Sequence, residues 1–311
     1  MTLLTTDAAL RDLAPEWHAL WRACPYATPF QSPAWLLAWW RVFGTGRPRV
    51  AVRRGADGAL VGVLPLYELA GRLLPIGAGL TDLQDALLAP GLGAEAAGAL
   101  LADVLAATAL PCDLTDLPPE AVLRDAPPPP GWRCQTIAAA PCPVLRDHAV
   151  PARQRRKLRM ARHRADRAGG WRVDDAGAAG LDALIRLHGA SWQARGDGGV
   201  FADPRVAAFL RAGAPPLLAA DAMRLATLRI GGEVVAAACV LPAPGRLLLW
   251  LGGWDPAAAQ CSPGTLLIGA LLEQAAAEGR REVNFLRGAE GYKYAWGATD
   301  RPNVTRRFTP P

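Results

Sequence analysis

The residues best suited to chemistry cluster in the segment Asn284–Ala298, NFLRGAEGYKYAWGA. Glu290 follows a predicted strand and has a glycine close on either side, and these glycines free the backbone to direct the carboxylate into a cleft. A carboxylate placed in this way can accept a proton from a reacting group, so Glu290 is the candidate general base. The alternative is a structural ion pair with Arg287 or Lys293. These two cations are also candidates for fixing an anionic part of the acceptor or the phosphates of a donor.

The loop Gln260–Leu266, QCSPGTL, lies where a predicted helix begins. Ser262 can cap this helix with its hydroxyl, and Pro263 suits the first helical position because its missing N–H costs nothing there. Gly264 allows close approach to the backbone. The free N–H groups of such a helix start, here from Ser262 to Leu267, suit a pyrophosphate. The alternative is a capped helix without a ligand.

These residues are positioned by a predicted unit of strand, loop, helix and strand. Leu247–Leu251 is an apolar run too short for a helix, and we predict a buried strand there. The pair Gly252-Gly253 lets the backbone open rather than continue pairing. Three- and four-residue apolar spacing then predicts a helix that ends at Gly279, and Glu282–Leu286 is predicted to form the next strand.

The same order of elements is predicted twice. In the second half, a helix at Leu181–Arg195 precedes a hairpin formed by Leu225–Ile230 and Val234–Leu241. In the first half, a hairpin turns at Asp57-Gly58 and is followed by strand, helix and strand. Two such copies predict a duplicated α/β unit.

The chain length favours two domains, because 311 residues exceed the usual size of one. Pro127–Pro130 can form neither a helix nor a central strand, and it predicts an extended connector. We place the boundary near His148. The N-terminal domain is then residues 1–148 and the C-terminal domain is residues 149–311.

The formal charge of +6 comes from one predicted helix, about Arg153–Ala168, whose eight Lys and Arg residues and single Asp give it +7. A thin seam of apolar residues lets it pack closely against a neighbour: Leu158, Ala161, Ala165 and Ala168. Three interpretations are open, namely a solvated linker, a clamp for phosphates or an anionic acceptor, and a docking surface for RNA or membrane. The lack of Phe, Tyr and Trp argues against single-strand stacking, and the weak apolar face argues against membrane insertion.

The loop around Gly264 resembles the Q/R-x-x-G-x-G/A loop with which GNAT acyltransferases bind the pyrophosphate of coenzyme A, although Thr265-Leu266 departs from that pattern. A longer resemblance covers nearly the whole chain. Its segments come in the order seen in the CelD/BioF2-like branch of the GNAT superfamily, which is related to the FemAB aminoacyltransferases: Phe30–Gly44, the arginine-rich helix, Leu187–Phe201, SPGTLL and Asn284–Ala298. The most specific part is F-L-R-G-x-E-x-Y-K.

The resemblance implies an α/β fold of two tandem GNAT-like domains, with mixed, mostly antiparallel sheets flanked by helices. It implies acyl transfer onto an amine, with acyl-CoA or an acyl carrier protein as donor and no metal. The donor is then held in the second copy by these residues: Gln260, Ser262, Gly264, Thr265 and Leu266.

The resemblance also implies roles for aromatic residues and a histidine. The helix Leu181–Arg195 borders the cleft in this family, so His188 can relay a proton while Trp192, on the same helical face, walls the acyl or acceptor channel. A buried, hydrogen-bonded histidine is the alternative. Tyr292 or Tyr294 can protonate the leaving thiolate, and both line the cleft if the preceding strand runs on that far.

Other functional classes find little support. The six cysteines have no C-x-x-C spacing and are expected to be small buried thiols, and the four histidines include no i,i+4 metal pair. A G-x-S-x-G motif is absent, which argues against hydrolase chemistry. The start of the sequence lacks the pattern of a signal peptide, and no apolar stretch reaches about 20 residues. We expect a cytoplasmic protein.

We therefore expect an N-acyltransferase that binds its donor in the C-terminal domain. The acceptor is the primary amine of a small molecule, peptide or sugar, bound in the inter-domain cleft, and no DNA partner or membrane insertion is expected. Two alternative functions are also compatible with the sequence. One is a FemAB-like transferase that uses aminoacyl-tRNA, and the other is a non-catalytic module that holds an anionic ligand.

Overall fold

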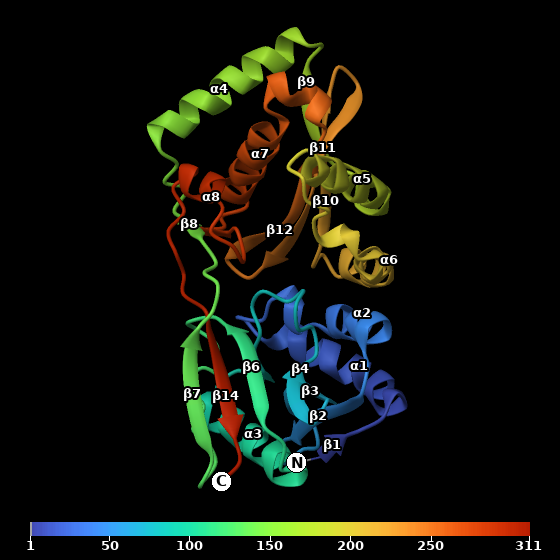
Figure 1. The fold of residues 1–311 in the computed structure, drawn as a ribbon, viewed down its shortest axis with the longest axis vertical. Helices are drawn as coiled ribbons and strands as arrows, with labels where there is room; N and C mark the ends of the chain where they lie inside the picture. The colour runs from blue at the N-terminus through green and yellow to red at the C-terminus, as the bar shows by residue number, and fades with distance from the viewer. Residues whose placement is uncertain (1) are drawn as a thin grey trace. The chain divides into compact units, whose positions relative to one another are not determined.

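A computed structural model describes residues 2–311, which form two compact units (Figure 1). The first unit ends at Cys142 and also contains Arg301–Pro311, whereas the second is Pro143–Asp300. The division between the units therefore lies a few residues before His148, where the sequence placed it, and the last segment of the chain returns to the first unit.

Two strands explain this division. β8 (Val144–Arg146) pairs antiparallel with β13 (Glu282–Asn284) in the sheet of the second unit. The last strand, β14 (Val304–Thr309), lies between β6 (Cys112–Leu117) and β7 (Arg133–Ala138) in the sheet of the first. Because each sheet recruits a strand from beyond the expected boundary, residues 149–311 do not form a separate domain.

The first unit is built on a mixed sheet in the order β1-β2-β3-β4-β6-β14-β7, with β5 paired to β3. Its remaining strands are β1 (Thr2–Leu4), β2 (Arg47–Arg54), β3 (Leu60–Leu69), β4 (Arg72–Pro75) and β5 (Leu87–Leu88). Its helices are α1 (Asp7–Ala23), α2 (Pro33–Phe43) and α3 (Ala94–Thr108). Trp35 and Trp39 on α2 are buried, whereas Trp40 is partly buried.

The second unit is built on a six-stranded sheet in the order β8-β13-β12-β11-β10-β9. Its remaining strands are β9 (Trp171–Asp175), β10 (Arg224–Ile230), β11 (Glu233–Ala243) and β12 (Arg246–Trp254). Its helices are α4 (Ala152–Arg167), α5 (Gly180–Gln193), α6 (Pro204–Ala219), α7 (Pro263–Ala277) and α8 (Gly291–Ala295), with a short 3-10 turn, η4 (Pro256–Cys261), before α7.

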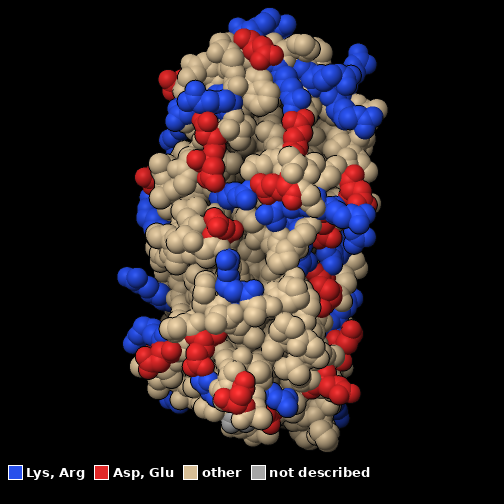
Figure 2. Space-filling view, turned by 180° about the vertical axis from the view of Figure 1, so that it is seen from behind, with Lys and Arg blue, Asp and Glu red and all other residues tan. Residues whose placement is uncertain are grey.

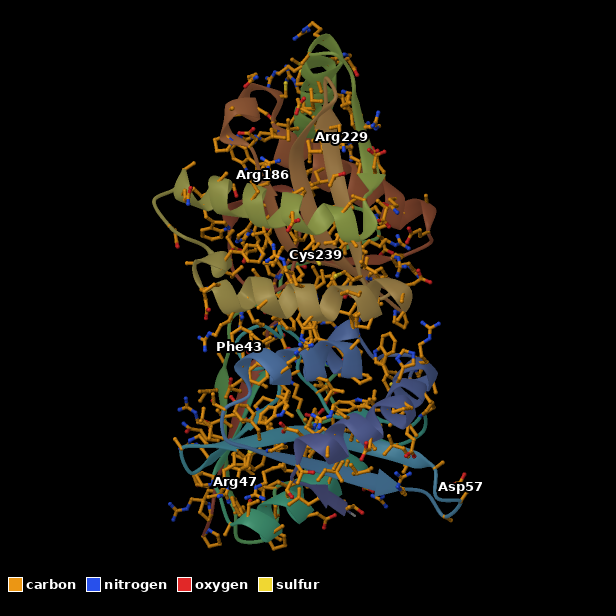
Figure 3. All side chains as sticks on the ribbon, turned by 90° about the vertical axis from the view of Figure 1, so that its right-hand side faces the viewer. Phe43, Arg47, Asp57, Arg186, Arg229 and Cys239 are labelled. Carbon is orange, nitrogen blue, oxygen red and sulfur yellow. The ribbon has the colours of Figure 1, made fainter. Side chains whose placement is uncertain are left out.

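Helices cover both faces of this second sheet. α5 and α6 lie on one face, and α4 and α7 lie on the other (Figure 1). Figure 3 faces the first pair, with the strands that carry Cys239 and Arg229 behind the helices. Alternate residues of β11, such as Ala236, Ala238 and Val240, join the core beneath α4 and α7, because successive side chains of a strand point to opposite faces.

Both units repeat one topology, which confirms the predicted α/β fold with mixed, mostly antiparallel sheets. In each, an antiparallel hairpin leads to a third, antiparallel strand and later a helix, and the strand after the helix pairs in parallel with that third strand. The parallel pairs are β4 with β6 in the first unit and β12 with β13 in the second.

The parallel pair β12–β13 opens after a short contact. β13 pairs only with Arg246–Leu248, but β12 continues to pair with β11 as far as Trp254. The prediction that pairing stops at the Gly252-Gly253 pair is therefore wrong on the β11 side. On the β13 side, no strand within residues 2–311 pairs with β12 beyond Leu248. A register shift beside Trp250 adds a bulge to this same stretch, a feature often found next to active sites.

The six cysteines are free thiols, as expected, and all but Cys134 are buried. Burial raises the pKa of the Cys112 and Cys239 thiols above the usual value, so both stay neutral. Within residues 2–311, no helix has the length and apolar content that crossing a bilayer requires.

Gly253 sets how closely α5 approaches β12. A Cβ atom added at Gly253 would lie 2.2 Å from the backbone nitrogen of His188, whereas one at Gly252 would lie no closer than 3.6 Å to Ala237. We expect Gly253→Ala to lower the free energy of unfolding by about 3 kcal/mol, because backbone cannot yield as a side chain can. Gly252→Ala is the matched control and should stay within about 1 kcal/mol of the wild type in urea unfolding. Equal stability of the two variants would contradict the close packing.

Candidate active site

The loop between β13 and α8 folds around the ammonium group of Lys293. Its Nζ donates hydrogen bonds to the carbonyl oxygens of Leu286 (2.9 Å), Arg287 (2.9 Å) and Gly288 (3.1 Å). It also pairs with the Glu290 carboxylate at 2.9 Å, and the Lys293 side chain is only 3% exposed. The expectation that Lys293 fixes an anionic ligand is not met by this geometry, since its donors are already in use.

Glu290 lies at the position preceding α8, and its side chain is 47% exposed. One carboxylate oxygen pairs with Lys293, so the ion pair weighed as the alternative is present. A Cβ atom at Gly288 would lie 2.6 Å from Glu290 Oε2, so a side chain at this position would displace the carboxylate. Glu290 is thus held in place from one side and open to solvent on the other, an arrangement compatible with a general base. Arg287 is partly buried beside it.

Asn284 was not singled out from the sequence, yet it shapes the same loop. Its side-chain Oδ1 accepts a hydrogen bond from the Leu286 N–H at 2.8 Å. Leu286 adopts a left-handed conformation with φ of 58°, which costs energy for a residue with a branched side chain. The Asn284 contact and the Lys293 contact compensate this strain, and β13 ends at Asn284 rather than at Leu286 as predicted.

The two tyrosines lie on helix α8 rather than on an extension of the strand. They therefore do not share a face, and the strand-based reasoning for both is wrong. The Tyr294 hydroxyl donates to the Asp300 carboxylate at 2.7 Å. Tyr292 is 49% exposed as a whole residue. Partial desolvation of its hydroxyl and the neighbouring Glu290 carboxylate raise the pKa of this hydroxyl to about 12, so it is protonated at neutral pH. Tyr292 packs edge-on against Phe285, with ring centroids 6.2 Å apart.

His188 is buried and binds the backbone of β12. Its Nδ1 lies 2.9 Å from the Gly252 carbonyl oxygen, which makes Nδ1–H the donor. Nε2 is buried without a hydrogen-bond partner among residues 2–311. Burial lowers the pKa of the imidazole, and the positive charge of Arg195 adds to this effect against the Gly252 hydrogen bond. His188 is therefore neutral at pH 7, and Trp192 lies next to it with ring centroids 5.8 Å apart.

Arg195, just beyond the end of α5, lies near groups of both α5 and α8, and no sequence pattern indicated this. Its guanidinium lies 5.4 Å from the Trp192 ring centroid, and its charge acts on both His188 and Tyr292. The structure thus brings together His188, Trp192, Glu290 and Tyr292, residues that were singled out separately. Arg195 and Tyr292 are about a hundred positions apart in the sequence. Residues so far apart form no periodic pattern when they meet in the fold, so the sequence could not identify Arg195.

The expected donor loop has the predicted position but a different local structure. Ser262 is left-handed, with φ of 53°, and its side chain makes no capping bond. Its N–H donates to Ala259, and the N–H groups of Thr265 and Leu266 donate back to the Ser262 carbonyl. Pro263 has no N–H, so Gly264 provides the first N–H of the helix that is open to a ligand. The loop therefore offers a ligand fewer N–H groups than the sequence predicted.

The basic helix α4 packs against α7 and η4 through the predicted seam. Leu158, Ala161 and Ala165 are buried, whereas Ala168 is exposed. Arg164 donates to the carbonyl oxygen of Gln260 in the donor loop at 3.3 Å. The basic helix therefore lies directly beside the loop expected to bind the donor.

Comparison with known proteins supports a transferase with a GNAT-type fold. Residues 152–294 match the family model described as an acetyltransferase (GNAT) domain. FemX has a TM-score of 0.66 at 12% identity, with 99% of this chain and 97% of that chain covered. L-PGS from Bacillus licheniformis has a TM-score of 0.61 at 14% identity, with coverages of 97% and 91%. No curated protein matches the sequence.

A third solved structure is also similar. The C-terminal domain of a putative lysylphosphatidylglycerol synthetase from Agrobacterium fabrum has a TM-score of 0.61 at 11% identity, with 96% of this chain and 92% of that chain covered. At these identities the likeness establishes the fold. The GNAT resemblance of the sequence motifs agrees with the family-model match.

The neutral state of His188 predicts a pH dependence of stability. Since the folded-state pKa lies below the unfolded value, the unfolded chain binds the proton more readily, and stability falls as pH drops below about 6.5. We expect the free energy of unfolding to decline less between pH 7.5 and pH 5.5 in His188→Gln than in the wild type. His163→Gln, on the exposed face of α4, is the control and should follow the wild type. Parallel curves for wild type and His188→Gln would contradict the assignment.

Proposed function

We propose that the protein is an N-acyltransferase of the CelD/BioF2-like type, which transfers an acyl group from acyl-CoA or an acyl carrier protein to a primary amine of a small molecule, peptide or sugar. The observation that carries this proposal is the edge of β12, which is unpaired beyond Leu248 and leads to the loop before α7. An extended donor can hydrogen-bond to such an edge as an added strand does. Its phosphate would then meet the N–H of Gly264. The match of residues 152–294 to a GNAT domain supports the same reaction class.

In the proposed reaction the neutral amine attacks the thioester carbonyl carbon, a C–N bond forms and the C–S bond breaks. Glu290 accepts the proton that the nitrogen loses. The sulfur leaves as a thiolate and takes the proton of the Tyr292 hydroxyl, which Glu290 then restores. The raised pKa of Tyr292 ensures that this proton is present at neutral pH. Lys293 positions Glu290 and does not touch the substrate.

The remaining residues are assigned by their surroundings. We assign His188 to positioning, because its Nδ1 holds the Gly252 carbonyl of β12 while its Nε2 is buried. Trp192 is proposed to wall the channel, and Arg287 to meet an anionic part of the acceptor. The donor contacts are proposed for the loop residues Gln260, Ser262, Gly264, Thr265 and Leu266. Binding of the acceptor between the two domains and a cytoplasmic location stay predictions.

Aminoacyl transfer is the second candidate, since FemX and a putative lysylphosphatidylglycerol synthetase share the fold over most of the chain. A non-catalytic module that binds an anionic ligand is the third. Incubation with acyl-CoA and a panel of amines, followed by assay of free thiol and product mass, tests the first. Transfer from charged tRNA that is abolished by RNase would select the second, and CoA binding without turnover would select the third.

Gly264 allows a direct test of the donor site. A Cβ atom at Gly264 would lie 3.4 Å from Trp254, which is an ordinary contact, so small side chains fit without unfolding the helix. We expect Gly264→Val to weaken CoA binding at least about tenfold, because its methyl groups shield the N–H, with little change in Tm. Gly264→Ala is the matched control with a smaller effect. Calorimetry that finds the same CoA affinity in Gly264→Val and the wild type would remove the donor site from this loop.

Glu290→Gln separates catalysis from the structural ion pair. The amide keeps the shape of the side chain but cannot take a proton, so turnover should fall by roughly 10²–10⁴-fold. The rate should recover as pH rises, because more of the acceptor amine is already neutral. CoA affinity should not change. If Glu290 serves only as the partner of Lys293, the loss will appear as a lower Tm, with modest kinetic effects that a higher pH does not repair.

A further inference from the structure

The outward face of α4 carries a stripe of exposed residues at helical spacing. We define the outer stripe by these residues: Arg153, Arg156, Met160, His163 and Arg167. They lie opposite the buried residues of the same helix, which include Gln154 and Leu158. Figure 2 shows Lys and Arg gathered along the upper right of the view, over α4. From Arg153 to Arg167 the stripe spans about 21 Å at the rise of an α-helix.

A small donor in the loop before α7 does not reach the outer stripe. The buried side of α4 is the side that packs on α7, where Leu158 would contact a Cβ atom at Gly269. The stripe is thus separated from α7 by the body of the helix, about 10 Å across with its side chains. The arginines nearer the loop have local partners, since Arg164 binds the Gln260 carbonyl and Arg162 binds Glu273. A partner that uses the stripe must therefore be a macromolecule.

The composition of the outer stripe favours an acidic protein. Met160, at its centre, is 46% exposed, and Arg and Met are both enriched at protein interfaces. Single-stranded RNA would find no aromatic side chain on α4 for stacking, and Asp166 and Glu273 on its flank would repel phosphates. A membrane surface would bury only one apolar side chain of the stripe, Met160, which argues against membrane binding.

The donor loop indicates which kind of acidic protein would dock on the outer stripe. Its N–H groups at Ser262, Thr265 and Leu266 are engaged internally, which leaves Gly264 for the donor phosphate. Coenzyme A carries a pyrophosphate and a further phosphate, whereas the phosphopantetheine of a carrier protein carries one phosphodiester. A narrow anion site beside a long basic surface suits the second donor, because the carrier itself supplies the remaining contacts.

We propose that the outer stripe of α4 docks an acidic acyl carrier protein, whose phosphopantetheine arm delivers the acyl group to the loop before α7. This inference rests on the proposed function and selects between its two donors. The carboxylates of the carrier pair with Arg153, Arg156 and Arg167, and Met160 packs against an apolar residue among them. Such charge complementarity governs partner choice and association rate.

The test measures binding of a purified holo acyl carrier protein by fluorescence anisotropy. Reversing two charges of the stripe, in Arg156→Glu/Arg167→Glu, should weaken binding at least about tenfold and flatten its dependence on salt. The control reverses two exposed arginines elsewhere, Arg11 on α1 and Arg186 on α5 (Figure 3), and should bind as the wild type does. Unchanged binding by the stripe variant would overturn the inference.

Activity assays separate this inference from the proposed function. The stripe variant should keep turnover with acyl-CoA and lose kcat/KM with the acylated carrier. If the protein turns over acyl-CoA but does not bind the carrier, only the docking inference is overturned. If it transfers an acyl group from neither donor, the proposed function is overturned, and the carrier-binding measurement is still valid. Wild-type binding to total tRNA or to phosphatidylglycerol vesicles in place of the carrier, lost in the variant, would also overturn the docking inference.

Discussion

A buried ammonium group organises the segment that carries the candidate chemistry. Burying a charge is costly unless it is paired and hydrogen-bonded, and Lys293 meets this condition with three carbonyl oxygens and one carboxylate. Those same contacts shape the turn from Leu286 to Gly288 and hold Glu290 at the start of α8. Much of the F-L-R-G-x-E-x-Y-K motif is thus used to build a loop. Within it, Glu290 and Tyr292 are the residues for which we propose catalytic roles.

The free edge of β12 is the second constraint. The strand is fixed on one side by β11 and on one face by α5, which approaches so closely that only glycine fits at position 253. His188 ties its imidazole to the carbonyl of the residue before. An edge held this firmly presents its hydrogen-bonding groups in a fixed register, which is what recognition of an extended ligand requires.

Local signals predicted most of the elements, because hairpin turns and helix periodicity depend only on residues that are close together in the sequence. The turns at Asp57-Gly58 and Gly231-Gly232 and the helix before Gly279 are examples. Helix α6, which contains Pro215 and Pro216, was not predicted, because prolines usually end a helix.

The site was predicted in part. Its residues were named, but their contacts depend on parts of the chain that meet only after folding. Lys293 was predicted to fix an anionic ligand or to pair with Glu290, and nothing in the sequence shows that carbonyl groups of a neighbouring turn also surround it. Arg195 and Asn284 were missed for the same reason. Ser262 was taken as a cap because serine prefers that role, whereas the tight turn after η4 requires a left-handed residue there.

The return of β14 to the first unit bears on how the protein is made. β14 is an internal strand between β6 and β7, and its buried Arg306 guanidinium donates to the carbonyl oxygens of Leu123 and Ala126, both at 2.7 Å. During translation the first sheet therefore cannot close until β14 leaves the ribosome, although all its other strands precede the second unit in the sequence. Throughout synthesis of the second unit, β6 and β7 present open edges. Until β14 is available, these open edges are sites at which the nascent chain can pair with another chain.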